Sequence, residues 1–302
     1  MHDLKKCTHE QKGFTLVELM VVMVIFLFIV AGVFTAYLSQ HHASVIQSQV
    51  TDMQQNARIA MDFLSKDIRM AGFGKPPGSV NGFSNAITPA INNDATSGNN
   101  VLNGTDQITV VTGYRQESTL QSAASVDSTS ITLVANADQF NTTTKRYVCI
   151  EGIGPIDNYQ VTSVNTSTNT LTVSPALHRA YQLGAPVLLV KAITYSVNDA
   201  GFLTRNENSG GGAQPVVPNI EDLQFAYQLD DDTWSNAPAV PGDIRTVRIT
   251  VLARTPFADH SPGQTGTIGQ RPDIEDHDVS NAADGFRRRL LSSVVEVRNL
   301  GF

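Results

Sequence analysis

The chain has 302 residues, of which 41% are hydrophobic and 16% are charged. This balance is typical of one or two globular domains rather than of a disordered or collagen-like polymer. The formal net charge is −7. Because nucleic-acid binding depends on clustered Lys and Arg, an acidic chain of this kind is not expected to bind nucleic acid.

A short polar leader, residues 1–13, precedes an apolar run over residues 14–38. The run is long enough to cross a bilayer core of about 30 Å at about 1.5 Å per residue. A secretory signal peptide has a shorter apolar core and a cleavage site after it, whereas this leader ends in Gly13 before the run. Three lysines of the leader favour a cytoplasmic N-terminus, with the rest of the chain outside.

Glu18 is the single charged residue in the apolar run. An unpaired carboxylate in a spanning helix costs roughly 2 to 3 kcal/mol or more, so we expect it to have a role. Cleavage between Gly13 and Phe14 creates an amine four residues before Glu18. The pair can close within one subunit, since positions four apart share a helix face, or between two subunits. An ordinary single-pass anchor, which would keep its leader, is the alternative.

A second helical stretch continues directly from the apolar run. Apolar residues recur at three- and four-residue spacing from Ile46 to Ala71, with charged residues between them. The stretch ends where Gly72, Gly74 and Pro76 interrupt the pattern. We therefore predict one helix over residues 14–72, with a transmembrane segment at 14–38 and an amphipathic second half.

Residues 73–302 are predicted to form a β-rich head outside the membrane. Short runs with strand-like alternation are separated by turn residues, and they comprise 108–112, 130–134, 147–150, 159–164, 170–173, 187–197, 223–229, 247–252 and 291–297. The predicted fold class is α+β, with the second half of the helix packed on a mainly antiparallel sheet.

The two cysteines, Cys7 and Cys149, lie on opposite sides of the apolar run, so an internal disulfide is excluded. We predict that Cys149 is buried as a small hydrophobic residue in the strand at 147–150.

Two segments of the head, 208–216 and 256–284, are predicted to be loops. The second contains acidic and histidine residues without the spacing of a known metal site, so we interpret them as solvated charges; they are Asp259, His260, Asp273, Asp276, His277 and Asp278. Asp230 to Asp232 are interpreted as an acidic turn. Arg287 to Arg289 are interpreted as a solvated strand entrance, with an acidic face of a sibling subunit as the alternative.

Motifs for catalysis are not found in the sequence. Gly152 to Pro155 resemble a dinucleotide loop only weakly and are interpreted as a turn. There is no phosphate loop, nucleophile elbow or paired-histidine zinc helix. We therefore predict a non-enzyme without catalytic residues, cofactor, metal or small-molecule substrate.

The segment Gly13-Phe14-Thr15-Leu16-Val17-Glu18 resembles the processing site of type IV prepilins. The resemblance implies that a prepilin peptidase cuts after Gly13 and that the new N-terminal residue, Phe14, is methylated. It also implies that Glu18 helps to dock the subunit by meeting the N-terminal amine of a neighbour.

Residues 53–73 and 294–299 are similar to the corresponding regions of PilW-type minor pilins. The resemblance implies a minor pilin that primes or supports assembly of a type IV pilus, first in the inner membrane and then at the cell surface. Its partners would be the other minor pilins and the major pilin. The large minor pseudopilin of a type II secretion system is the alternative. Unlike major pilins, the chain lacks a proline in its spanning half and a C-terminal cysteine pair.

Overall fold

A computed structural model describes residues 13, 15–74, 79–152, 157–259, 269–278 and 284–299. The chain divides into two compact units, Met1–Gln49 and Val50–Phe302. One long helix, α1 (Leu16–Arg69), begins in the first unit and ends in the second. It covers most of the helix predicted over 14–72.

Thr15 caps the start of α1. Its hydroxyl oxygen Oγ1 accepts a hydrogen bond from the Glu18 N–H at 3.2 Å, and its carbonyl accepts one from the Leu19 N–H at 3.2 Å. The hydroxyl therefore satisfies an N–H of the first turn that has no partner within the helix. Thr and Glu at the cap and third helical positions match the sequence of a capping box.

The end of α1 is marked by Gly72, which has a φ of +82°. This left-handed conformation is easily adopted only by glycine. The Gly72 N–H then donates to the Val111 carbonyl at 2.8 Å. The chain therefore leaves the helix and joins the edge of the head's main sheet at the glycine predicted to end the helix.

In the first unit, α1 exposes its apolar side chains on every side. Leu16, Phe28 and Phe34 are all more than half exposed. Among the described residues, α1 alone is long and apolar enough to cross a membrane. Within its apolar stretch, the Thr35 hydroxyl, Oγ1, lies 2.9 Å from each of the carbonyl oxygens of Ala31 and Gly32, to which it donates. Such bonding satisfies a polar group that lipid could not.

In the second unit, one face of α1 is buried. Met53, Ala57, Ala60, Leu64 and Ile68 are at most 4% exposed and recur at three- and four-residue spacing. They pack in a core with side chains from both sheets of the head. The amphipathic second half was predicted from this spacing, and the prediction is confirmed.

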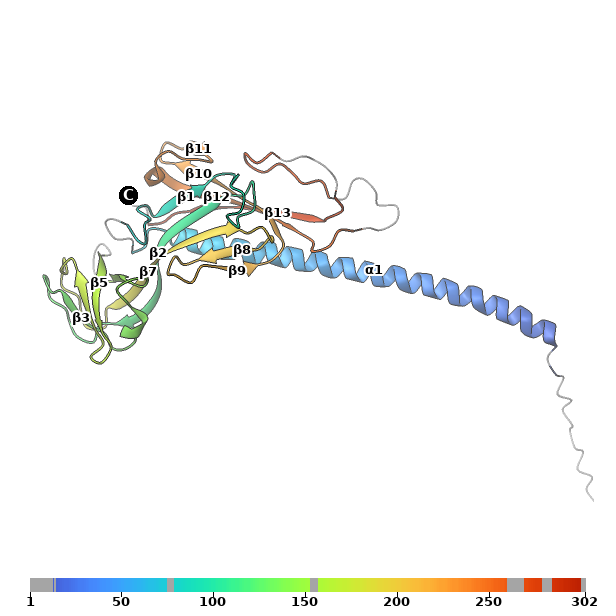
Figure 1. Cartoon of the computed structure of the whole chain (residues 1–302), viewed down its shortest axis with the longest axis horizontal. Helices are drawn as coiled ribbons and strands as arrows, with labels where there is room; N and C mark the ends of the chain where they lie inside the picture. The colour runs from blue at the N-terminus through green and yellow to red at the C-terminus, as the bar shows by residue number, and fades with distance from the viewer. Residues whose placement is uncertain are drawn as a thin grey trace, which may run out of the picture. The chain divides into compact units, whose positions relative to one another are not determined.

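Within the described residues, the larger sheet has nine strands, all paired antiparallel (Figure 1). Its path is β1 (Ile87–Ile91), β2 (Gln107–Thr119), β7 (Pro186–Val197), β4 (Tyr147–Ile150), β5 (Asp157–Asn165), β6 (Thr170–Ser174) and β3 (Ser130–Thr132). Off this path, β8 (Leu203–Asn206) pairs with β7, and β9 (Ala213–Val217) pairs with β8.

The smaller sheet has, in the part of the chain that the structure describes, four strands in the order β11 (Trp234–Ser235), β10 (Ile220–Leu229), β12 (Ile244–Arg254) and β13 (Arg288–Glu296). Two short 3₁₀ turns, Ala137–Gln139 and Pro241–Asp243, complete the described elements. The predicted α+β class with a mainly antiparallel head is confirmed.

The strands β2 and β7 connect two hydrophobic cores: residues of β7 lie in both, and β2 leads from the first core to Leu120 in the second. Ile108 and Ile193 lie in the core that contains α1, whereas Leu120 and Val187 lie in a second core formed with β3 to β6. Figure 1 shows β3 and β5 in a lobe at the ends of β2 and β7. The second core has no residue from α1.

The predicted strands all coincide with observed strands, but one predicted loop is partly wrong. Residues 208–216 were expected to be a loop, whereas Ala213–Val217 form β9 on the edge of β8. Because β9 is largely exposed and contains Pro215, it lacks the alternation that marks a half-buried strand. Gly210 and Gly212 have φ values of +92° and +70°, so the glycine turn before β9 is observed.

Replacing Leu64 by Ala should lower the free energy of unfolding of the head by about 2 to 5 kcal/mol, because a fully buried leucine is truncated. Chemical unfolding of the full-length protein in detergent, followed by the fluorescence of Trp234, measures the change. Gln55→Ala, at an exposed position of the same helix, is the matched control and should change stability by less than about 0.5 kcal/mol. Equal stability of the two variants would contradict the packing of α1 on the sheets.

Candidate functional site

Gly13 and Glu18 lie at the start of α1, and Phe14 lies outside the described residues. Gly13 is exposed, and a Cβ atom built on it would meet no atom within 4 Å. Its φ is also outside the left-handed range that favours glycine. The fold therefore gives no steric reason for glycine at this position.

Glu18 is exposed in the first turn of α1. A carboxylate is favoured there because the unpaired N–H groups of the first turn carry partial positive charge. No other Asp, Glu, Lys or Arg occurs between residues 14 and 51. The side chains around Glu18, including Leu19 and Val22, are apolar and exposed. This carboxylate is thus the only formal charge on a surface that lipid or other subunits would cover.

A buried polar cluster joins the second half of α1 to the larger sheet. The Tyr195 hydroxyl donates to Asp67 Oδ2 at 2.7 Å, and Arg205 Nε lies 3.4 Å from the same oxygen. Burial, and then the nearby Asp67 charge, raise the pKa of Tyr195 above its ordinary value. Asp67 is one of the charged residues between the apolar positions of the helix, and its contact could not be predicted from the sequence because its partners lie more than 100 residues away along the chain.

The three arginines 287–289 are not all solvated, and that interpretation is wrong for two of them. Arg287 donates to Asp259 at 2.7 Å. The Arg288 side chain is only 6% exposed and lies between Glu221 and Asp284. The carboxylates reduce the cost of burying these guanidinium groups. Arg289 is exposed.

The interpretation of the charged residues of 256–284 as solvated is wrong for Asp259 and His277, which have ion-pair partners and largely covered side chains. It is confirmed for the exposed residues Asp273, Asp276 and Asp278. His277 Nδ1 lies 2.9 Å from Asp222 Oδ2, and Asp276 accepts a bond from Asn92 at 2.8 Å. Asp259 has a side chain only 5% exposed. His260 lies outside the described residues. Among the residues that the structure describes, no group of three potential metal ligands (His, Cys, Asp or Glu) occurs.

Two turn predictions have different outcomes. Asp231 lies in the tight turn before Trp234, where Thr233 donates to its carboxylate through N–H and hydroxyl at 3.0 and 2.6 Å. These bonds lower the pKa of Asp231, and the acidic turn is confirmed. Residues 153–156 of the other predicted turn lie outside the described residues.

Cys149 is buried with 0% exposure and is a free thiol, which confirms the prediction. Burial, followed by the charge of Glu151, raises its pKa to about 12. A Cβ atom on Gly74 would lie 2.7 Å from its sulfur, so this glycine allows the chain to pass directly over the thiol. The neutral, covered thiol is suited to packing and not to reaction.

Two family models match the chain. Residues 8–34 match the prokaryotic N-terminal methylation motif, and residues 158–299 match the type IV pilus-assembly protein W family. The first match contains Gly13, Phe14 and Glu18, and the second runs from β5 to the end of β13. The chain is a type IV pilin-like protein of the PilW type.

This identification makes the protein a minor pilin of a type IV pilus and does not favour the pseudopilin alternative. Neither family description is that of an enzyme. Among solved structures, the type IV-like pilin TTHA1219 from Thermus thermophilus is similar over 53% of this chain and 87% of its own, at 14% identity and a TM-score of 0.25. No curated protein matches the chain.

The apolar helix and the methylation motif fit a minor pilin that is anchored in the inner membrane and then joins a pilus. They also suggest processing by a peptidase and contact with other pilus subunits. The head residues of the PilW match include the Arg205 partner of Asp67 and the Arg288 ion pairs.

Proposed function

We propose that this minor pilin is made as a precursor, with residues 1–13 as a leader, 14–72 as the pilin helix and 73–302 as the head. A prepilin peptidase cuts after Gly13, and the amine of Phe14 is methylated. The observation that carries the proposal is a helix whose first half is apolar on all sides and has one carboxylate in its first turn. The protein acts as a structural subunit and not as an enzyme.

Cleavage explains both unusual features of the start of α1. Gly13 has no role in packing, so glycine is required at this position for recognition by the peptidase. Glu18 lies four residues after the new amine, and an amine is the partner that a carboxylate at membrane depth requires. A bond within one subunit stabilises the membrane-inserted monomer, whereas a bond to a neighbour's amine selects for assembly.

The spanning segment 14–38 holds the N-terminus in the cytoplasm and the head outside. Lys5, Lys6 and Lys12 of the leader supply the positive charge that keeps this end inside. During assembly the exposed apolar side chains of α1 leave lipid and contact the helices of the other minor pilins and the major pilin. The apolar surface remains covered throughout.

The head suits a position at or near the start of the filament. A shaft repeats one subunit, and every head must then pack against copies of itself. This head has a second lobe, β3 to β6, built on its own core outside the core that contains α1. A terminal subunit is free of that packing constraint on one side, so we infer that this chain primes assembly.

Intact-mass measurement of the protein from native membranes should give a chain that begins at N-methylated Phe14. Gly13→Leu should block cleavage while leaving membrane insertion unchanged, because the fold leaves open space at Gly13 and insertion depends on residues 14–38. Gln11→Leu, inside the leader, is a matched control and should be processed. A wild-type protein that keeps Met1 would disprove the proposed maturation.

Glu18→Ala should leave the amount of protein in the membrane near normal and reduce its incorporation into sheared filaments by about tenfold or more. The ion pair between Glu18 and a neighbour's amine is expected to contribute about 1.4 kcal/mol or more. Its loss would shift the equilibrium between membrane and filament about tenfold or more toward the membrane. Glu18→Asp is the comparison variant, since it keeps the charge on a shorter side chain. Normal incorporation of the Ala variant would remove the docking role, and loss of membrane protein alone would favour pairing within one subunit.

Quantitative mass spectrometry of purified filaments should find far fewer copies of this chain than of the most abundant pilin. Deletion of the gene should strongly reduce the number of filaments while the remaining filaments keep their ordinary diameter. Near-equal amounts of the two chains would show instead that this chain is the shaft subunit.

A further inference from the structure

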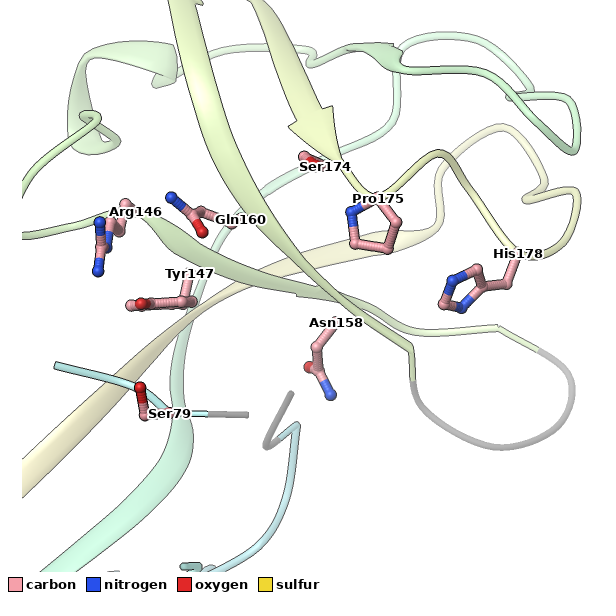
Figure 2. A pocket seen from close by; sticks show the side chains of 8 residues that line it. All are labelled: Ser79, Arg146, Tyr147, Asn158, Gln160, Ser174, Pro175 and His178. Atoms are coloured by element: carbon pink, nitrogen blue, oxygen red, sulfur yellow. The ribbon is translucent and has the colours of Figure 1, made fainter. Parts of the chain in front are cut away.

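A hollow lies on the open face of the lobe formed by β3 to β6. Its volume is about 540 Å³, within the range of about 300 to 1,000 Å³ typical of small-molecule sites. Figure 2 shows Arg146, Tyr147 and Gln160 together at one end, Pro175 and His178 at the other, and Asn158 between them. Nothing in the proposed assembly role uses this hollow.

The strands themselves direct polar side chains into the hollow. Tyr147 of β4 pairs directly with Gln160 of β5, which pairs with Ser174 of β6. Side chains opposite one another on neighbouring strands share a face of the sheet, and so do residues two apart on one strand. Asn158 therefore joins this row. Four side chains from three rigid strands line one wall.

Tyr159 lies between Asn158 and Gln160 and is directed to the opposite face, where it is fully buried in the second core. Its hydroxyl is 2.9 Å from that of Tyr181, and it also accepts the N–H of His178 at 3.2 Å. The buried tyrosine thus holds the loop that carries Pro175 and His178. The second core therefore positions β5 on one side of the hollow and the loop on the other.

Arg146 gives the hollow a positive charge. Its guanidinium carbon lies 4.9 Å from the centre of the Tyr147 ring, a cation–π contact that fixes the side chain. Its Nε–H is buried and meets no acceptor in the part of the chain that the structure describes. By contrast, Arg115, Arg248 and Arg288 each lie within 2.8 Å of a carboxylate. Among the lining residues that the structure describes, none is acidic.

We propose that this hollow binds one acidic sugar residue of a polysaccharide or glycan. The carboxylate of the sugar pairs with Arg146, since guanidinium and carboxylate form charge-assisted hydrogen bonds. The ring hydroxyls bond to Asn158, Gln160 and Ser174. Amide and hydroxyl groups both donate and accept, as sugar hydroxyls do. The Pro175 ring lies against the apolar face of the sugar.

The composition of the hollow argues against simpler ligands. A lone phosphate or acetate would use the donors of Arg146 and leave the carbonyl oxygens of Asn158 and Gln160 without a donor from the ligand. A hydrophobic ligand would leave the buried Nε–H of Arg146 without an acceptor, which is costly. An acidic sugar satisfies donors, acceptors and charge together. Binding requires only the folded head, so it is independent of the proposed priming role.

Isothermal titration calorimetry on the full-length protein tests the proposal, in a zwitterionic detergent that has no sugar headgroup. The probes are galacturonate, glucuronate and N-acetylneuraminate, with galactose and acetate as neutral-sugar and simple-carboxylate controls. At least one acidic sugar should bind about tenfold or more tightly than either control, because only it uses the charge and the hydroxyl contacts together.

Three variants assign the binding to the hollow. Arg146→Met keeps an aliphatic side chain over Tyr147 but removes the charge, so it should weaken binding of the acidic sugar about tenfold or more. Lys145→Met removes the same charge one residue away, outside the lining, and should have less than about a twofold effect. Gln160→Glu is similar in size and should also weaken binding, because it places a negative charge beside the ligand. Its half-buried position makes it the safer variant if Arg146→Met unfolds.

Several outcomes would overturn the proposal. They are saturation by none of the three acidic sugars, equal affinity for galactose, equal affinity for acetate, and unchanged binding in both Arg146→Met and Gln160→Glu. Tighter binding of a short peptide through its free C-terminal carboxylate would show that the hollow is a peptide site instead. A failure here would leave filament incorporation of the wild-type subunit intact, whereas failure of the priming role would not change sugar affinity.

Discussion

One helix must satisfy two surroundings, and the rest of the structure follows from that constraint. Over residues 16–38 the side chains of α1 are apolar, apart from Glu18 and Thr35, and exposed all round, so this segment is stable only when lipid or other subunits cover it. From Val50 the apolar positions narrow to one stripe, which the two sheets of the head bury. The same covalent helix is therefore a membrane segment at one end and a core element at the other.

The head secures its part of the helix by apolar packing and by one ionic contact. Leu64 and Ile68 are fully buried, and one turn of helix carries both Ile68 and Asp67. Asp67 meets the Tyr195 hydroxyl and the Arg205 guanidinium, on β7 and β8. Hydrophobic burial supplies most of the stabilisation, whereas the buried ionic contact requires a specific rotation of the helix, because an Asp67 buried without its partners would be costly.

Periodicity alone predicted the helix, nine of the strands that the structure describes and the burial of Cys149. It missed β1, β8, β9 and β11, which are short or exposed and whose pairing depends on neighbours distant in sequence. It also misread Arg288 and Asp259 as solvated. Their partners, Glu221 and Arg287, come close only when β10, β12 and β13 form a sheet. Gly13 and Glu18 were found from a short motif, whereas the hollow beside Arg146 requires the register of three strands.

The two cores allow the two proposed roles to be separated within one head. The core containing α1 holds the residues that respond to assembly, and β2 and β7 extend from it into the second core. Tyr147, Gln160 and Ser174 line the hollow on β4 to β6. The buried Tyr159 positions β5 from the second core, and Tyr147 lies in a third, smaller cluster with Cys149. A substitution in the hollow therefore changes side chains that do not contribute to the α1 core. Because the cores share only continuous strands, the ligand surface can vary without altering how the helix is held.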